Sequence, residues 1–155
     1  MIIRAAREED VRGFIELAAQ VEHWFGPMVA TPGFRAALTR HIGRGTALAA
    51  VTDAGEDLLG GVLFTARPPA YHVRWLVVAG HAHGTGVGRA LLDDAARRFV
   101  TAPGTVEVVT LGADHPGAAA SGARIFYERL GFAPAEAAAH GPEGGSRQAY
   151  RKPVT

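Results

Sequence analysis

The sequence predicts an α/β fold for its 155 residues. Short apolar runs of strand length alternate with segments in which apolar residues recur at helical spacing. Two of these runs, at 46–52 and 58–66, are separated only by D-A-G-E-D, which indicates a β-hairpin. A later apolar run leads through a glycine-rich turn into an amphipathic segment. Because neither a repeat nor a linker interrupts this order, we expect a single domain over residues 1–155.

The N-terminal third predicts one strand and two helices. Ile2–Ala5 has the composition of a short strand, and three acidic residues then place negative charge at a helix start. The following segment repeats apolar residues at the spacing of one buried helical face: Val11, Phe14, Ile15 and Ala18. Thr31 and Pro32 have the residue types of an N-cap and a first helical position, and Gly43 is the expected end of that second helix.

The remaining chain predicts three further strands and two helices. After the hairpin, residues 71–79 form the third strand of a meander, and the spacing of apolar residues predicts a helix over Val87–Phe99. Residues 105–112 form the next strand. A second helix carries Tyr127 and has Gly131 placed as its left-handed cap. Residues 147–152 follow a glycine-rich turn and form the last expected strand.

The turn at 83–89, H-G-T-G-V-G-R, carries the strongest chemical signal in the chain. Glycines at 84, 86 and 88 leave the backbone N–H groups uncovered by side chains. The helix that follows adds unpaired first-turn donors and the positive end of its dipole, so the turn is suited to hold an anion, most often a phosphate. The alternative is a strand–helix turn that binds nothing.

The nature of the phosphate ligand follows from the motif's details. No Gly-Lys pair exists in the chain, which excludes the nucleotide P-loop, and Arg89 stands where a dinucleotide fingerprint needs its third glycine. The nearer match is the acyl-CoA turn R/Q-x-x-G-x-G/A, with His83, Gly86 and Gly88 at its first, fourth and sixth places.

A second motif, A-R-I-F-Y-E-R-L-G-F at 123–132, completes a resemblance to the GNAT family of acetyl-CoA-dependent N-acetyltransferases. The resemblance covers residues 72–135 well and the N-terminal third only in outline. It implies a mixed, mostly antiparallel sheet of six to seven strands flanked by about four helices. It also implies that the strands at 71–79 and 105–112 are parallel neighbours that splay apart, so that the pantetheine arm of acetyl-CoA enters between them.

The resemblance assigns acetyl-CoA as cosubstrate. No metal is expected, because the H-x-H at 81–83 has no nearby carboxylate and a phosphate-binding turn accounts better for these histidines. Tyr127 would donate a proton to the departing sulfur, although a half-buried structural tyrosine is the alternative. The expected acyl-CoA contacts are Val77, Val78, His83, Gly84, Thr85, Gly86, Val87, Gly88, Arg89, His115 and Tyr127. Either the ring of His83 or only its backbone N–H would reach the pyrophosphate. For His115 the alternative is a purely structural role in its loop.

The general base and the acceptor site are less defined. Many family members carry a glutamate on the strand before the turn, but this chain has Arg74 there and no acid from 71 to 82. His72 is the substitute base, with a structural histidine or a water chain as alternatives. His23, Trp24, Phe25 and Arg74 are the acceptor-site candidates. The acceptor itself, a small-molecule or peptide amine, is not identified by the sequence.

The composition of the chain argues against several other classes of protein. The net charge of +1 gives no reason to expect nucleic acid, and no apolar run is long enough to span a membrane. The chain has no cysteine, and its charged N-terminus does not resemble a signal peptide, so a cytoplasmic enzyme is expected. The family commonly forms dimers, and a homodimer remains open because the sequence marks no interface. A non-catalytic acyl-CoA-binding module is the alternative to an active N-acetyltransferase.

Overall fold

The computed structural model describes residues 1–55 and 57–155, so the hairpin turn expected at 53–57 lies partly outside the described residues, at Glu56. Its elements follow in the order β1 (Ile2–Ala5), η1 (Glu8–Asp10), α1 (Val11–Phe25), α2 (Pro32–Arg44), β2 (Ala47–Val51), β3 (Leu58–Arg67), β4 (Ala70–Val78), η2 (Gly80–Ala82), α3 (Val87–Phe99), β5 (Gly104–Leu111), α4 (Gly117–Ser121), α5 (Ala123–Arg129), β6 (Ala133–Ala138) and β7 (Arg147–Val154).

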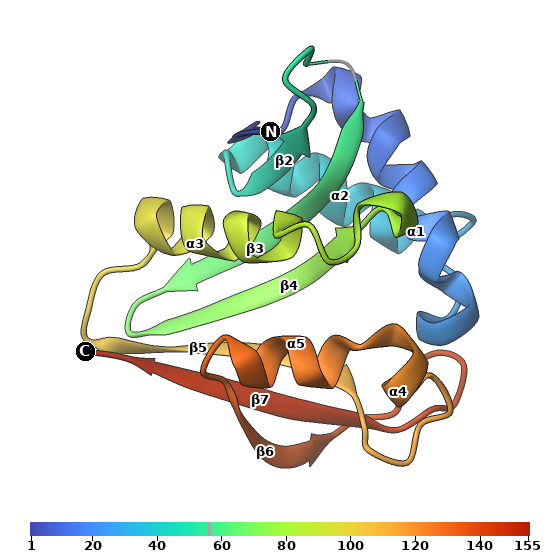
Figure 1. Ribbon diagram of the computed structural model, residues 1–155, viewed down its shortest axis with the longest axis vertical. Coiled ribbons are helices and arrows are strands. Elements are labelled where there is room, and N and C mark those ends of the chain that lie inside the picture. Colours follow the sequence, from blue (N-terminus) through green and yellow to red (C-terminus); the bar gives the residue numbers. More distant parts are fainter. Residues whose placement is uncertain (56) are drawn as a thin grey trace.

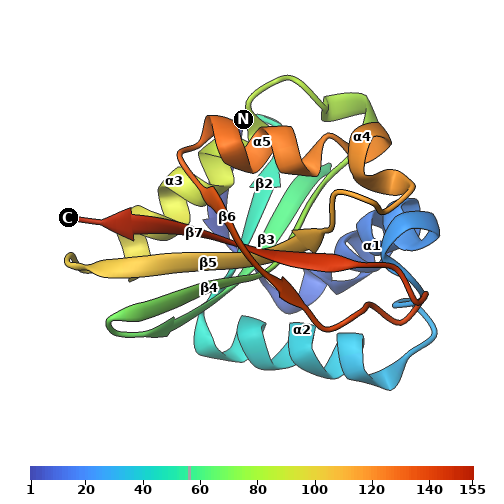
Figure 2. The same ribbon diagram turned by 90° about the horizontal axis from the view of Figure 1, so that it is seen from below.

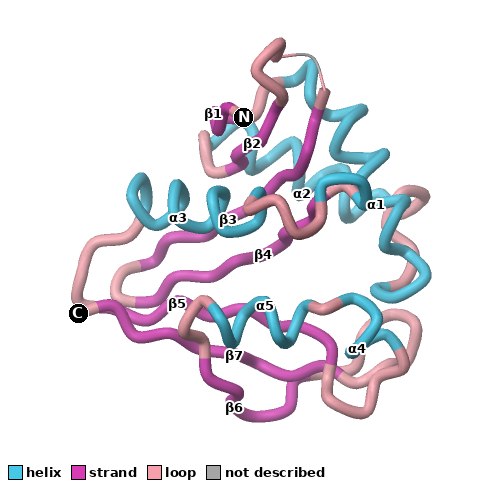
Figure 3. The backbone as a smooth tube through the Cα atoms, in the orientation of Figure 1, coloured by secondary structure: helices cyan, strands magenta, loops and turns pink. Residues whose placement is uncertain are grey.

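The strands form one seven-stranded sheet in the order β1-β2-β3-β4-β5-β7-β6 (Figure 1, Figure 3). Every neighbouring pair is antiparallel except β4 and β5, which are parallel. The α/β class and the mixed, mostly antiparallel sheet are therefore confirmed, as is the parallel pairing of the strands predicted at 71–79 and 105–112. Helix α3 connects these two strands, as a parallel pair requires.

The parallel pair separates along its length. β4 and β5 are paired only from Ala70↔Thr105 to Val73↔Val108, and beyond this point both strands continue without pairing to each other. The separation begins beside a bulge in β4, where Phe64 of β3 faces Val73 and Leu63 faces Trp75, so Arg74 has no partner of its own. The two strands diverge visibly in Figure 1.

Helices cover both faces of the sheet, and two adjacent glycines of β3 allow them to pack closely. α3 and α5 lie on one face, and α2 lies on the other (Figure 2). A Cβ atom at Gly60 would lie 3.0 Å from Val87 of α3, while one at Gly61 would lie 2.4 Å from the ring of Phe14 in α1. Side chains of consecutive strand residues point to opposite faces, so this pair brings α3 and α1 close to the sheet from its two sides.

The structure differs from the expected elements in two places. α2 continues past Gly43 to Arg44, because the left-handed residue that ends it is Gly45, with φ of 73°. The short helix α4 and the strand β6 were not expected, since neither has a clear apolar period. With α4, the described residues contain five α-helices, one more than the four segments predicted as helices. The cap at Gly131 is confirmed by its φ of 93° and by the bond from the Phe132 N–H to the Tyr127 carbonyl, 3.0 Å.

No helix in the described part of the chain combines the length and the apolar composition that crossing a membrane requires.

Candidate active site

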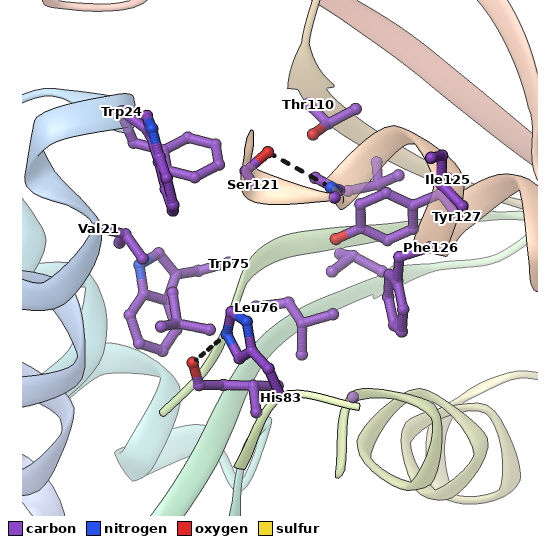
Figure 4. Close-up of a pocket in the computed structure, with 18 of the residues that line it drawn as sticks. Val21, Trp24, Trp75, Leu76, His83, Thr110, Ser121, Ile125, Phe126 and Tyr127 are labelled. Carbon is purple, nitrogen blue, oxygen red and sulfur yellow. Dashed lines mark hydrogen bonds between the residues drawn. The ribbon is translucent and has the colours of Figure 1, made fainter. Parts of the chain in front are cut away.

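A cleft of about 890 Å³ opens where β4 and β5 diverge (Figure 4). Its walls come from the end of α1, from β4 and β5, from the glycine turn with the start of α3, and from α5. Segments far apart in the sequence thus face one space. The sequence-predicted residues that line it are Trp24, Phe25, Arg74, Val77, Val78, His83, Gly84, Gly86, Val87, Gly88, Arg89 and Tyr127.

The glycine turn presents unused backbone donors to this cleft. Within the described residues, the N–H groups of Gly84, Gly86, Val87, Gly88 and Arg89 have no backbone acceptor. Gly84 and Gly86 have φ of 77° and 89°, which other residues adopt only with strain, and a Cβ atom at either would meet nothing within 4 Å. The turn therefore combines open space with free donors at a helix N-terminus, which suits a phosphate group.

The third glycine of the turn has a different role. Gly88 is buried in the first turn of α3, and a Cβ atom there would lie 2.9 Å from the Phe126 ring of α5. Real Cβ atoms do not approach an aromatic carbon that closely, so the absent side chain is what lets α5 close against α3. Gly88 thereby connects the position of the turn to the position of Tyr127, the next residue after Phe126.

Tyr127 lies with its hydroxyl toward the open cleft and its ring in the core (Figure 4). The ring is held edge-on by Phe126 and Phe132, at centroid distances of 5.0 and 5.5 Å, and the residue is only 6% exposed. Burial raises the pKa of the Tyr127 phenol well above its usual range. The group therefore stays protonated at neutral pH and can act as a proton donor.

His72 is not brought to the cleft. It is paired in register with Glu107 of β5, and its Nε2 lies 3.8 Å from a Glu107 carboxylate oxygen. Its neighbours Tyr71 and Val73 belong to the same core as Tyr127, so His72 points to the opposite face of the sheet. Burial and the nearby Arg74 lower the pKa of His72, which leaves it neutral but remote from the Tyr127 hydroxyl.

Two other histidines named from the sequence make local bonds. The His83 ring lines the cleft and its Nε2 lies 2.9 Å from the Val78 carbonyl at the end of β4 (Figure 4). His115 is buried, and its Nδ1 accepts a hydrogen bond from the Gly117 N–H at 2.8 Å, at the start of α4. It is not among the residues that line the cleft, and neither is Thr85, whose hydroxyl donates to the Ala82 carbonyl at 2.5 Å.

The structure places some of the acceptor-site candidates in the cleft and others outside it. Trp24 and Phe25 line the cleft, whereas the exposed His23 ring packs on Trp24 from outside, 4.1 Å between centroids. The Arg74 side chain donates to the Thr65 hydroxyl at 3.2 Å. Sequence reasoning missed several lining residues, because only tertiary contacts bring them here: Val21, Met28, Trp75, Thr110, Ser121, Ile125, Phe126, Arg129, Pro142 and Arg147.

Carboxylates near the rim of the cleft are engaged elsewhere. Glu22 accepts hydrogen bonds from the Met28 and Val29 N–H groups, at 2.5 and 3.1 Å, which lowers its pKa. Glu143 binds the buried Arg147 at 2.6 Å. Burial alone would raise the pKa of Glu143, but the hydrogen bonds from Arg147 and from the Gly145 N–H, with the positive charge of Arg147, together lower it. No Asp or Glu is among the described residues that line the cleft.

A family model for the acetyltransferase (GNAT) domain matches residues 40–134 of this chain. The match includes the glycine turn and Tyr127 and covers more than half of the sequence. The chain belongs to the GNAT acetyltransferase family. The resemblance stated from its two motifs is therefore confirmed, and the chain carries a GNAT acetyltransferase domain.

Solved structures of GNAT proteins share the fold over the whole chain. A protein from Desulfovibrio desulfuricans described as a GNAT-family acetyltransferase has a TM-score of 0.73 at 22% identity, covering 99% of both chains. The PaiA N-acetyltransferase from Thermoplasma acidophilum, in complex with coenzyme A, has a TM-score of 0.71 at 16% identity, covering 99% of this chain and 98% of its own.

The ribosomal-protein-alanine N-acetyltransferase from Brucella melitensis has a TM-score of 0.71 at 18% identity, covering 99% of this chain and 100% of its own. At such identities the similarity shows the fold. A search of curated protein sequences found no match.

Proposed function

We propose that this GNAT protein transfers an acetyl group from acetyl-CoA to a primary amine by direct attack within a ternary complex. The observation that carries the proposal is that the free donors of the glycine turn and the protonated Tyr127 hydroxyl open into one cleft. The PaiA structure, of the same fold, holds coenzyme A, which supports the same ligand here.

The cleft fits an acyl-CoA thioester in its shape and in its donors. The unpaired N–H groups at 84 and 86–89 would bind the pyrophosphate, and Arg89, exposed in the first turn of α3, would add a cation beside it. Val77 and Val78 line the separated part of β4, where the pantetheine arm would lie between the strands. Acetyl-CoA supplies the activated acyl group as a thioester.

Tyr127 provides the proton that the leaving group needs. As the amine nitrogen bonds to the acyl carbon, the carbon–sulfur bond breaks and the sulfur leaves with negative charge. Tyr127 donates its proton to that sulfur and regains one from the ammonium nitrogen through water, so the products are an amide and a free thiol. The chain has no cysteine, so no thioester with a cysteine side chain can form on it.

The amine would reach the site neutral or lose its proton to water. His72 faces the other side of the sheet, and the lining of the cleft supplies no carboxylate within the described residues. His72 is therefore too far from the cleft to act as the base. The lack of a carboxylate among the described lining residues also favours a second candidate, a non-catalytic acyl-CoA-binding module. Such a module would bind the ligand without transferring its acetyl group.

Tyr127→Phe separates the two candidates. It removes only the hydroxyl, so acetyl-CoA affinity should stay nearly unchanged while kcat falls on the order of 10²-fold, as for loss of one general acid. Thiol release with one accepted amine, measured across pH, gives kcat, and calorimetry gives the affinity. His72→Ala is the companion variant and should leave the pH profile unaltered.

A Tyr127→Phe enzyme with wild-type kcat would refute the proposed role of Tyr127. Coenzyme A binding without thiol release, for any amine of a broad panel, would favour the binding module instead.

A further inference from the structure

One side of the cleft is built from large apolar side chains. It comes from α1, the loop after it, β4 and the loop before β7, and we name it the acceptor wall: Val21, Trp24, Phe25, Met28, Trp75 and Pro142. Figure 4 shows Val21, Trp24 and Trp75 opposite the Tyr127 hydroxyl. A group held against this wall would therefore face the proton donor across the cleft.

The acceptor wall is held in place by the surrounding core. The Trp75 ring packs against Phe14 and Phe34, with centroids 5.7 and 5.4 Å away. The indole of Trp24 lies directly against the backbone of α4, as shown by Gly117, where an added Cβ atom would be only 2.5 Å from the indole. Packed aromatic side chains of this kind form a preformed surface, which favours an apolar ligand body of matching size.

The charges that line the cleft do not favour a cationic acceptor. Its ionisable lining residues, among those described, are bases apart from the phenol of Tyr127: Arg74, His83, Arg89, Arg129 and Arg147. The nearby carboxylates of Glu22 and Glu143 are bound to backbone N–H groups and to Arg147. An ammonium ion would lose its hydration here without gaining a counter-charge, which is unfavourable.

One buried side-chain polar atom of the wall has no partner within the described residues. The indole Nε1 of Trp75 is buried and, within the described residues, makes no hydrogen bond. In Figure 4 this nitrogen lies on the edge of the ring near Val21 and Trp24, on the side of the acceptor wall. A buried N–H without an acceptor is costly. The atom is closed to solvent in this structure, so a ligand carbonyl oxygen would reach it, and relieve the cost, once the neighbouring Val21 and Trp24 side chains move apart.

We infer that the acceptor is a weakly basic primary amine on an apolar body, with a carbonyl group beside the amine. The inference rests on the proposed acetyl transfer and specifies its acceptor. The α-amine of an apolar amino-acid amide, or of a peptide that begins with an apolar residue, has this chemistry, since its pKa is about 8 rather than the roughly 10.4 of a lysine side chain. An amine of this kind is partly neutral at pH 7 and needs no carboxylate base.

A matched panel of amines tests each part of the inference by thiol release from acetyl-CoA. Phenylalaninamide has the apolar body, the weak base and the carbonyl, whereas 2-phenylethylamine keeps only the body, and glycinamide lacks it. Spermidine and the side chain of an Nα-blocked lysine represent basic amines. A short peptide with N-terminal Phe distinguishes a polypeptide acceptor from a free small molecule. We expect phenylalaninamide or the peptide to give kcat/KM at least tenfold above every other amine.

Two variants address the wall directly. Trp75→Phe removes the indole N–H and should raise KM for phenylalaninamide about fivefold to tenfold, the size expected for loss of one neutral hydrogen bond, but not for 2-phenylethylamine, which has no carbonyl. Met28→Glu places a carboxylate in the wall and should shift the preference at least tenfold toward 2-phenylethylamine. Met28→Gln, of the same size without the charge, should not.

The outcomes separate the inference from the proposed function. Transfer to spermidine or to the lysine side chain in preference to phenylalaninamide would overturn the inference while leaving acetyl transfer intact. An equal effect of Trp75→Phe on both aromatic amines would likewise overturn the assigned hydrogen bond. Failure of thiol release with every amine, despite coenzyme A binding, would instead contradict the proposed function.

Discussion

Gly88→Ala tests whether the packing of α5 against α3 positions the catalytic tyrosine. The new Cβ atom would lie 2.9 and 3.0 Å from two carbons of the Phe126 ring, where ordinary contact begins at 3.4 Å. The ring must therefore retreat by about 0.5 Å, and overpacking of this kind costs about 1–3 kcal/mol. Replacing a helical glycine by alanine returns about 1 kcal/mol. The clash outweighs the gain, and the variant should be less stable by up to about 2 kcal/mol.

The same displacement should lower the rate. Tyr127 follows Phe126 in α5, so a shift of about 0.5 Å in that helix moves its hydroxyl relative to the bound thioester, and we expect kcat to fall about tenfold. Thermal unfolding should show a Tm lower by up to about 8 °C, at roughly 2–4 °C per kcal/mol for a chain of this size.

Gly43→Ala is the matched control for this substitution. Gly43 is also helical, but a Cβ atom there meets nothing within 4 Å, and α2 does not line the cleft. Alanine should therefore raise the stability by about 0.4–1 kcal/mol and leave kcat unchanged. If Gly88→Ala also raised Tm and kept the wild-type kcat, the contact with Phe126 would not have the role that we assign to it.

Two further predictions concern the ligand turn and the response to pH. Gly86→Asp should abolish coenzyme A binding in calorimetry, because it adds negative charge beside the phosphates. The variant should still fold, since the new side chain enters open space and the positive φ of 89° costs only about 1–2 kcal/mol. An unchanged affinity for coenzyme A would show that the phosphates bind elsewhere. Burial, with the positive charges of Arg40 and Arg44 nearby, lowers the pKa of His41 in the folded protein. Neutral His41 therefore contributes stability above the pKa of about 6.5 that it has in the unfolded chain, and this stability should be lost as the pH falls through the lower pKa of the folded state. Tm should thus drop between pH 7.5 and 5.5, and His41→Gln, which cannot titrate there, should reduce that drop; an unaltered drop would assign it to other groups.

Local patterns in the sequence determined most of the elements and their connections. The glycine turn, the helix Val87–Phe99 and the cap at Gly131 depend on residues close in the chain, so motif and period predicted them. The parallel pairing of β4 and β5 also followed, because a helical crossover leaves little other choice. Tyr127 was identified by its place in a motif, and the structure turns its hydroxyl toward the cleft.

Contacts between distant segments decided the rest. The bulge at Arg74 depends on the register between β3 and β4, and it lies where β4 and β5 stop pairing. Trp75 therefore falls in the separated part of β4 and lines the cleft, whereas His72 stays in the paired part beside Glu107. Gly88 resembled a phosphate-binding glycine in the sequence, but its close neighbour is an aromatic ring 38 positions further along the chain, Phe126. The acceptor wall joins α1, β4 and the loop before β7, and no local period relates these segments, because only the packed sheet brings them together.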